Sequence, residues 1–123
     1  MIVMSQGGTD RDLFLKRSRD IEHAKKHGRR ISTAFFNMMI CETEVSGSRV
    51  GIVVGKRFGG AVSRNRAKRL FRELTRQVQD QLIPGQALVV FPKRESILQP
   101  FAVLKEAWLS SLQRQRLLRI PEA

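Results

Sequence analysis

Apolar residues recur at helical or strand spacing in six stretches of the chain. In three of them the apolar residues return about every 3.6 positions, which predicts amphipathic helices. In the other three they form short, nearly unbroken runs of the kind typical of buried strands. The pattern therefore predicts helices over residues 13–27, 62–81 and 100–118, and strands over residues 33–42, 50–54 and 87–91.

Glycine, proline and polar residues mark where these elements end. Gly28 follows the first helix, and Pro100 begins the last one, where its fixed backbone angle suits a first helical turn. The first two strands are joined by a short polar loop with a turn signal at residues 46–48, so we expect an antiparallel pair. A chain of 123 residues fits one domain. We predict a flexible N-terminal segment over residues 1–12 and a single α/β domain over residues 13–120.

The helix predicted over residues 62–81 has two unlike faces when its residues are spaced 100° apart. One face is apolar and suited to packing on a sheet; it consists of Ala67, Leu70, Phe71, Leu74 and Val78. The opposite face is basic; it consists of Asn65, Lys68, Arg69, Arg72 and Arg76, with Arg64 and Arg66 at its edges. Like charges four residues apart repel by about 0.2–0.5 kcal/mol per pair, so such a row is unfavourable without a polyanionic partner. Arginine suits that partner because its planar guanidinium binds phosphate oxygens in pairs.

The charge of the whole chain points to the same kind of partner. The chain has 23 Lys and Arg residues against 11 Asp and Glu residues, a formal net charge of +12. Its pI is about 11.4. So much positive charge repels itself within one small domain, and nucleic acid is the usual compensation. The composition therefore argues against an ordinary small-molecule enzyme and predicts that the domain over residues 13–120 binds nucleic acid.

The chain offers little catalytic or metal-binding chemistry. Its one cysteine, Cys41, excludes an internal disulfide and a cysteine-based zinc site, and we expect it in the core. His23 and His27 are spaced four residues apart, but their basic neighbours disfavour a metal cation. No nucleophile–base pattern stands out, so we predict no catalytic and no metal-binding residue. With no signal-peptide pattern and no long apolar run, the simplest expectation is a soluble cytoplasmic protein.

Two features near the start of the arginine-rich helix each allow two interpretations. Gly59 and Gly60 either form a plain turn or let the backbone amides of the helix start accept a phosphate. Asn65, which lies among the arginines, either makes a local backbone hydrogen bond or contacts a base edge or a 2′-hydroxyl.

The segment around this helix matches a family signature at many positions. It reads Lys56-Arg57-x-Gly59-x-Ala61-Val62-x-Arg64-Asn65-Arg66-x-Lys68-Arg69-x-x-Arg72-Glu73. This segment resembles the signature of the bacterial ribonuclease P protein component. The resemblance extends over about residues 13–118, and it includes the basic first helix, the strand before the motif, and the strand and helix after it.

The resemblance implies both a fold and a function. The implied fold is an α/β sandwich, with a central, mostly antiparallel sheet packed by a basic N-terminal helix, the arginine-rich helix and a C-terminal helix, and with a left-handed crossover. The implied function is that of the protein subunit of ribonuclease P, a ribonucleoprotein endonuclease that removes the 5′ leader of precursor tRNA. Its catalytic RNA performs the hydrolysis with Mg²⁺, and the protein has no active site of its own.

The resemblance also implies two binding surfaces. The surface for the catalytic RNA is expected to comprise Lys56, Arg57, Arg64, Asn65, Arg66, Lys68, Arg69, Arg72 and Arg76. A cleft between the first helix and the sheet is expected to hold the leader; it comprises Lys16, Arg17, Ile21, Lys25, Phe36 and Met39. The family tends to have aromatic residues at the positions of Ile21, Lys25 and Met39 and an asparagine at Gly60. Leader binding here is therefore expected to depend more on charge and apolar contact than on stacking.

Composition alone leaves other functions open. A structural RNA-binding protein, such as a small ribosomal protein, has a similar composition, and only the full motif favours the ribonuclease P subunit. A DNA-binding regulator is disfavoured because glycines and a strand, rather than another helix, precede the arginine-rich helix. A membrane-surface role is the weakest alternative because the apolar helix faces match a core. We therefore expect neither DNA nor a membrane as a partner.

Overall fold

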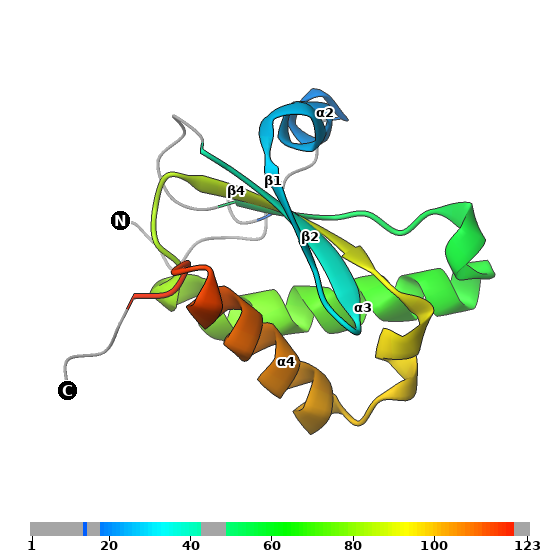
Figure 1. Cartoon of the computed structure of the whole chain (residues 1–123). Coiled ribbons are helices and arrows are strands. Elements are labelled where there is room, and N and C mark those ends of the chain that lie inside the picture. The colour runs from blue at the N-terminus through cyan, green and yellow to red at the C-terminus, as the bar shows by residue number, and fades with distance from the viewer. Residues whose placement is uncertain (1–13, 15–17, 43–48, 120–123) are drawn as a thin grey trace.

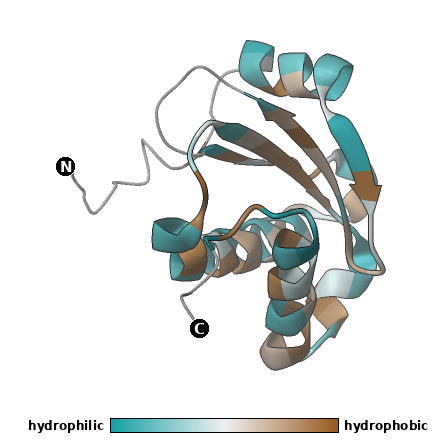
Figure 2. Ribbon diagram, turned by 60° about the vertical axis from the view of Figure 1, so that its left-hand side comes forward, coloured by the Kyte–Doolittle hydropathy of each residue, from teal (hydrophilic) through white to brown (hydrophobic). Residues whose placement is uncertain are grey.

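The chain folds into three layers, with a four-stranded sheet between one helix and a pair of helices (Figure 1). This computed structural model describes residue 14, residues 18–42 and residues 49–119. The strands are β1 (Arg29–Ser32), β2 (Phe36–Glu42), β3 (Arg49–Ile52) and β4 (Gln86–Pro92). The helices are α2 (Ser18–His27), α3 (Ala61–Val78) and α4 (Phe101–Arg114), and the short 3-10 helices are η1 (Lys56–Phe58), η2 (Gln79–Gln81) and η3 (Arg94–Leu98). Helix α2 covers one face of the sheet, and α3 and α4 cover the other (Figure 2).

The strands lie in the order β1-β2-β4-β3. Strand β2 pairs antiparallel with β1 and β4, whereas β3 pairs parallel with β4. Because parallel neighbours need a crossover connection, the chain passes from β3 to β4 through α3. The expected α/β fold with a mostly antiparallel sheet is confirmed. The predicted pairing of segment 33–42 with segment 50–54 is wrong, because β4, a continuous buried apolar run, lies between them.

Strand β1 and the start of the first helix also differ from the sequence prediction. The pattern gives no signal for β1, because its residues are mostly charged or polar and exposed, as suits an edge strand. The helix predicted over residues 13–27 is wrong at Phe14, which forms an isolated parallel bridge to Val50. Helix α2 is assigned from Ser18 onward. Residues 1–12, predicted to be flexible, lie outside the described residues.

The last predicted helix ends earlier than its apolar pattern suggests. Helix α4 ends at Arg114, and Arg116 then adopts a φ of 58°, which turns the chain. After this turn Leu118 pairs with Leu82 in an isolated antiparallel bridge. Both leucines are buried, so the apolar residues after α4 close the core without extending the helix.

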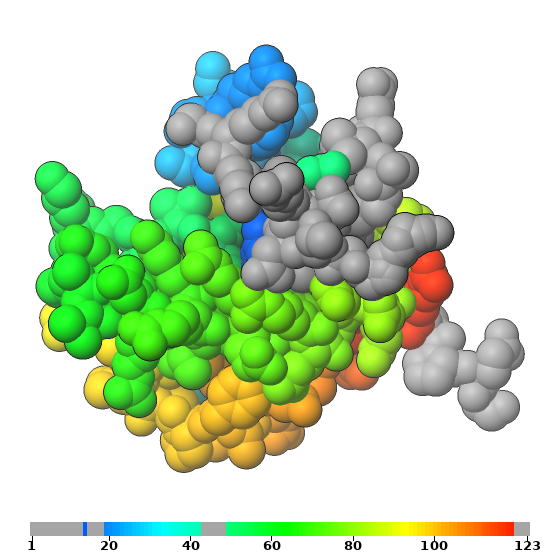
Figure 3. Space-filling model, turned by 180° about the vertical axis from the view of Figure 1, so that it is seen from behind, coloured from blue at the N-terminus to red at the C-terminus, as the bar shows by residue number. Residues whose placement is uncertain are grey.

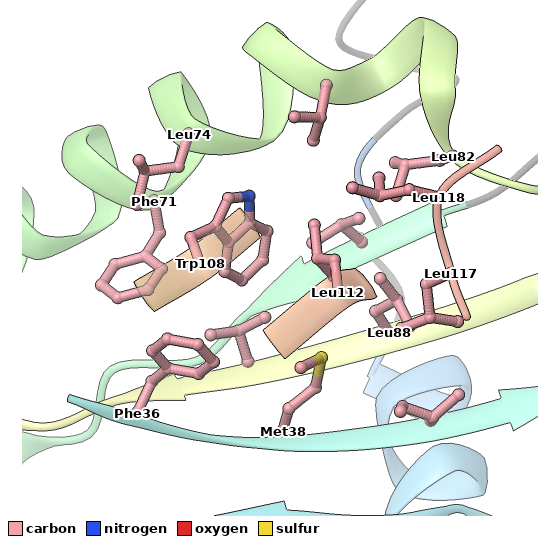
Figure 4. Close-up of a cluster of buried hydrophobic side chains, with 14 of the residues drawn as sticks. Phe36, Met38, Phe71, Leu74, Leu82, Leu88, Trp108, Leu112, Leu117 and Leu118 are labelled. Carbon is pink, nitrogen blue, oxygen red and sulfur yellow. The ribbon is translucent and has the colours of Figure 1, made fainter. Parts of the chain in front are cut away.

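The main core lies between the sheet and helices α3 and α4 (Figure 4). At its centre Trp108 packs edge-to-face against Phe36 and Phe71, with ring centroids 5.5 and 5.9 Å away. The helical spacing predicts that Phe101 belongs to the apolar stripe of the last helix. Phe101, the first residue of α4, is instead exposed, and the buried residues of α4 begin at Leu104. The predicted apolar face of α3 is confirmed: its buried residues include Ala67, Phe71, Leu74 and Val78, and Leu70 packs beside them.

A smaller apolar cluster joins α2 to the other face of the sheet. Its buried members are Ala24, Cys41 and Val89, which confirms that Cys41 is a core residue. Gly28 allows the close approach of this helix end to β2. A Cβ atom at Gly28 would lie 2.5 Å from the Ala24 carbonyl oxygen and 3.0 Å from the Ile40 carbonyl oxygen. A side chain there would therefore force the end of α2 away from β2.

Candidate nucleic-acid interface

A glycine turn sets the start of α3. The 3-10 helix η1 leads into Gly59, whose φ of +152° is one that residues with a side chain rarely adopt. The carbonyl of Gly60 then accepts a helical hydrogen bond from the amide of Arg64 at 3.0 Å. Arg64 also donates from Nη1 to the carbonyl of Gly59 at 3.0 Å. The glycine pair therefore serves the turn, and one of the predicted RNA-binding arginines helps to hold it.

The outer side of α3 forms a basic surface that we call the arginine face (Figure 3). It consists of the exposed Asn65, Arg66, Arg69, Arg72 and Arg76, with the half-buried Arg64 and Lys68 at its edges. Lys56 and Arg57 are exposed on η1, which packs against α3. The structure thus brings together, on α3 and the turn that precedes it, the residues expected to meet the catalytic RNA.

Two guanidinium groups of the arginine face lie over an aromatic ring. The guanidinium carbons of Arg72 and Arg76 are 6.0 and 5.8 Å from the centroid of the Phe14 ring. Arg76 also approaches Glu73, with 3.9 Å between Nη1 and Oε1 in an exposed pair that contributes little stability. Contacts of this kind restrict long side chains before binding, so less conformational entropy is lost when they meet phosphates.

A second basic surface lies on the other side of the sheet, next to α2. A pocket of about 380 Å³, which we call the α2 pocket, is lined by Lys25, Arg30, Asn37, Met39 and Phe91. The strand register explains this set. Arg30 is paired with Met39 and Asn37 with Phe91, and directly paired residues project from the same face of a sheet. Lys25 reaches the pocket from α2.

The α2 pocket combines an aromatic ring with cations and an amide. The Lys25 Nζ lies 5.8 Å from the centroid of the Phe91 ring, within the range of a cation–π contact. The Ser32 hydroxyl donates to Oδ1 of Asn37 at 2.8 Å, which orients the amide. An aromatic face, nearby cations and an amide are the groups that proteins use to hold unpaired nucleotides.

Only some of the residues predicted for the leader cleft lie together at the α2 pocket. Lys25 and Met39 line the α2 pocket, and Ile21 belongs with Met39 to the apolar cluster beneath α2. The prediction that Phe36 belongs to the leader cleft is wrong. Phe36 is fully buried in the main core on the opposite face of the sheet, because successive residues of a strand alternate between faces. It cannot contact a ligand in the pocket. Lys16 and Arg17 lie outside the described residues.

Sequence reasoning missed three residues of the α2 pocket. Asn37 is the one polar residue within an apolar run, and its place next to the core residue Phe36 is the signal that marks the other face. Arg30 gives no such signal because β1 has no recognisable strand pattern. Phe91 continues the apolar run of β4 and is easily taken for core. Phe91 is the one aromatic residue that lines the α2 pocket, whereas positions 21, 25 and 39 hold no aromatic residue.

The described residues contain neither a cluster of metal-ligating side chains nor a helix that could span a membrane. Among them, no group of three or more His, Cys, Asp or Glu side chains could hold a metal ion. His23 and His27 are exposed on α2, with ring centroids 4.6 Å apart. No helix within the described ranges is long and apolar enough to cross a membrane.

Comparisons with known proteins relate the whole fold to one family. The family model described as Ribonuclease P matches residues 10–116. The ribonuclease P protein component of Chloroflexus aggregans is 30% identical over 109 residues, which cover 88% of this chain and 81% of that protein. The one from Syntrophus aciditrophicus is 36% identical over 87 residues, with coverage of 66% and 73%. The solved structure of the RNase P protein from Thermotoga maritima has a TM-score of 0.74 at 31% identity, covering 81% of this chain and 94% of that chain. The present chain belongs to the ribonuclease P protein component family.

Proposed function

We propose that this chain is the protein subunit of a cytoplasmic ribonuclease P and binds two RNAs at once. The arginine face holds the catalytic RNA, and the α2 pocket holds the 5′ leader of precursor tRNA. The observation that carries this proposal is the position of the two basic surfaces on opposite sides of one sheet. Two surfaces that face apart can contact an RNA scaffold and a separate substrate strand without competing for the same side chains.

The arginine face has the chemistry of a phosphate-binding surface. Its exposed guanidinium groups repel one another along α3, and Glu73 is the one carboxylate within the helix to offset them. Binding of an RNA backbone replaces this repulsion with charge-assisted hydrogen bonds and releases counterions. The arginine face therefore suits a folded RNA, whose phosphates lie at fixed positions.

The α2 pocket has the chemistry of a single-strand site. Phe91 offers a face for stacking, while Lys25 and Arg30 offer positive charge to the phosphates on either side of a base. The pocket is open to solvent and extends over β1, β2 and β4, so an extended strand can pass across this face of the sheet. A leader of unpaired nucleotides fits these features better than a double helix does.

Within the described residues, no group of three or more His, Cys, Asp or Glu side chains gathers. As the resemblance implies, we propose that the Mg²⁺ of the reaction is used mainly by the RNA. The role of the protein is to supply cationic side chains that reduce the repulsion between two polyanions. With 23 basic and 11 acidic residues, the chain can replace part of the screening by Mg²⁺.

Cleavage of precursor tRNA across a range of Mg²⁺ concentrations tests this function. The protein alone should not cleave at any concentration. The catalytic RNA should cleave alone at high Mg²⁺, and addition of the protein should lower the Mg²⁺ concentration that it needs. Arg69→Ala should reduce this effect, whereas Arg114→Ala, which removes an exposed arginine from α4, should leave it nearly unchanged.

Two results would contradict the proposal. Cleavage by RNA-free protein would place the catalytic groups in this chain. Binding to the catalytic RNA without any change in the Mg²⁺ requirement would instead favour a purely structural RNA-binding protein.

A further inference from the structure

A second pocket borders the arginine face, where the beginning of α4 lies next to α3. Figure 3 shows this side of the molecule, with α3 crossing the surface above the first turns of α4. The pocket is an open depression of about 540 Å³. We call it the α3–α4 pocket. It is lined by Val62, Arg66, Arg69, Leu70, Glu73 and Phe101.

Half of the lining residues of the pocket are apolar: Val62, Leu70 and Phe101. Leu70 is half-buried and packs against the main core. Val62 is 82% exposed and Phe101 is 37% exposed, although both are large apolar side chains. Exposure of such groups to water is unfavourable, so a ligand that covers them gains free energy from the burial.

The charges of the pocket are divided between two parts of α3. Arg66 and Arg69 lie nearer the start of the helix, and Glu73 lies one turn beyond Arg69. A phosphate is therefore attracted toward the arginines and repelled by the carboxylate. The Glu73 carboxylate can accept a hydrogen bond from the exocyclic amino group of adenine, cytosine or guanine, which uracil lacks.

We propose that the α3–α4 pocket binds one unstacked nucleobase of the catalytic RNA. The base lies against Phe101 and Leu70, its flanking phosphates contact Arg66 and Arg69, and Glu73 selects a base that carries an amino group. This inference rests on the proposed role of the arginine face, because the pocket shares Arg66 and Arg69 with that surface.

Charge favours RNA over a second copy of the chain as the occupant. A symmetric dimer through this pocket would place the same patch on both subunits in contact. Each subunit would then bring two arginines and only one carboxylate, that of Glu73, to the interface, so the net positive charges of the two patches repel. An RNA strand suits both parts of the pocket, because its base can contact the apolar lining while its phosphates contact the arginines.

The test compares Phe101→Ala with Leu98→Ala in binding to the catalytic RNA. Leu98 is a matched control, because it is a 77% exposed apolar residue of η3 that does not line the pocket. Phe101→Ala should weaken binding by about 5- to 150-fold, the range found when one stacking ring is removed. The slope of log affinity against log salt should not change for Phe101→Ala, whereas Arg66→Ala should reduce it by about 1.

Chemical probing of the bound RNA identifies the base. The wild-type protein should protect the base-pairing edge of one unpaired A, C or G, and Phe101→Ala should expose that edge again. Phe101→Leu keeps apolar bulk but has no aromatic face, so it should also lose the protection while remaining folded. Phe101→Trp should keep it.

Three results would overturn the inference. Equal affinity and equal base protection for Phe101→Ala and Leu98→Ala would show that the pocket is not used. A dimer of the wild type that Phe101→Ala dissociates, with RNA affinity unchanged, would show that the pocket binds a second copy. Failure of the wild type to bind the catalytic RNA at all would remove the proposed function along with this inference.

Discussion

Phe36 and Asn37 are neighbours in the chain, yet they lie on opposite faces of the sheet. Phe36 is fully buried against Phe71 and Trp108, while Asn37 lines the α2 pocket across from Phe91. The strand period of two causes this division, because each side chain points away from the one before it. A shift of one position along β2 therefore decides whether a residue stabilises the core or lines the α2 pocket.

The same division holds for α3, and it can be tested with one residue from each face. Leu74→Ala removes a side chain that is 1% exposed in the main core and should lower the free energy of unfolding by about 2–5 kcal/mol. Arg69→Ala removes an exposed side chain and should change that free energy by less than about 0.5 kcal/mol. Denaturant unfolding measures both values.

The RNA affinities of these two variants should show the reverse order. Arg69→Ala should weaken binding to the catalytic RNA, whereas Leu74→Ala, under conditions where it remains folded, should bind nearly as well as the wild type. If one variant showed both losses, or if the two effects were exchanged, the assignment of the faces of α3 would be wrong.

At the scale of elements, the contact between α2 and the sheet is the critical one for the α2 pocket. It depends on a small apolar cluster and on the close approach at Gly28, whose amide donates to the Ala24 carbonyl at 2.7 Å. The pocket has Lys25 on the helix and its other lining residues on the strands. Any shift of α2 therefore changes the shape of the pocket directly.

Gly28→Ala should separate α2 from the sheet and destabilise the protein. The added Cβ meets backbone oxygens that cannot move independently, and overpacking of this kind costs about 1–3 kcal/mol. Gly55→Ala is the matched control, because a Cβ there meets nothing within 4 Å. Thermal unfolding of the two variants measures the difference. Equal stability would show that the approach of α2 to β2 is not tight.

The elements themselves were largely predictable from the sequence, but their pairing was not. The apolar periodicity of α3 and the continuous run of β4 give strong local signals. Periodicity does not report which strands are neighbours, so the insertion of β4 between β2 and β3 has no local signal. Strand β1 is missed because it is short, basic and at the edge of the sheet.

At the scale of the whole molecule, the net charge of +12 and the motif around α3 are sufficient to predict an RNA-binding function. The arginine face is also predictable, because all its members lie on one helix and obey one period. The α2 pocket is only partly predictable, because it joins residues of α2, β1, β2 and β4. The α3–α4 pocket likewise depends on where α4 begins to pack against α3.

The central claim is that the two sides of the sheet bind two different RNAs. Its most direct test is the affinity of the assembled enzyme for precursor tRNAs with a leader of several nucleotides and with a very short leader. The wild type should bind the long-leader substrate more tightly. Lys25→Ala should lose most of this preference because it removes a cation from the α2 pocket. Lys105→Ala, which removes an exposed lysine from α4 on the other side of the sheet, should retain it. Equal leader preference in all three proteins would contradict the claim.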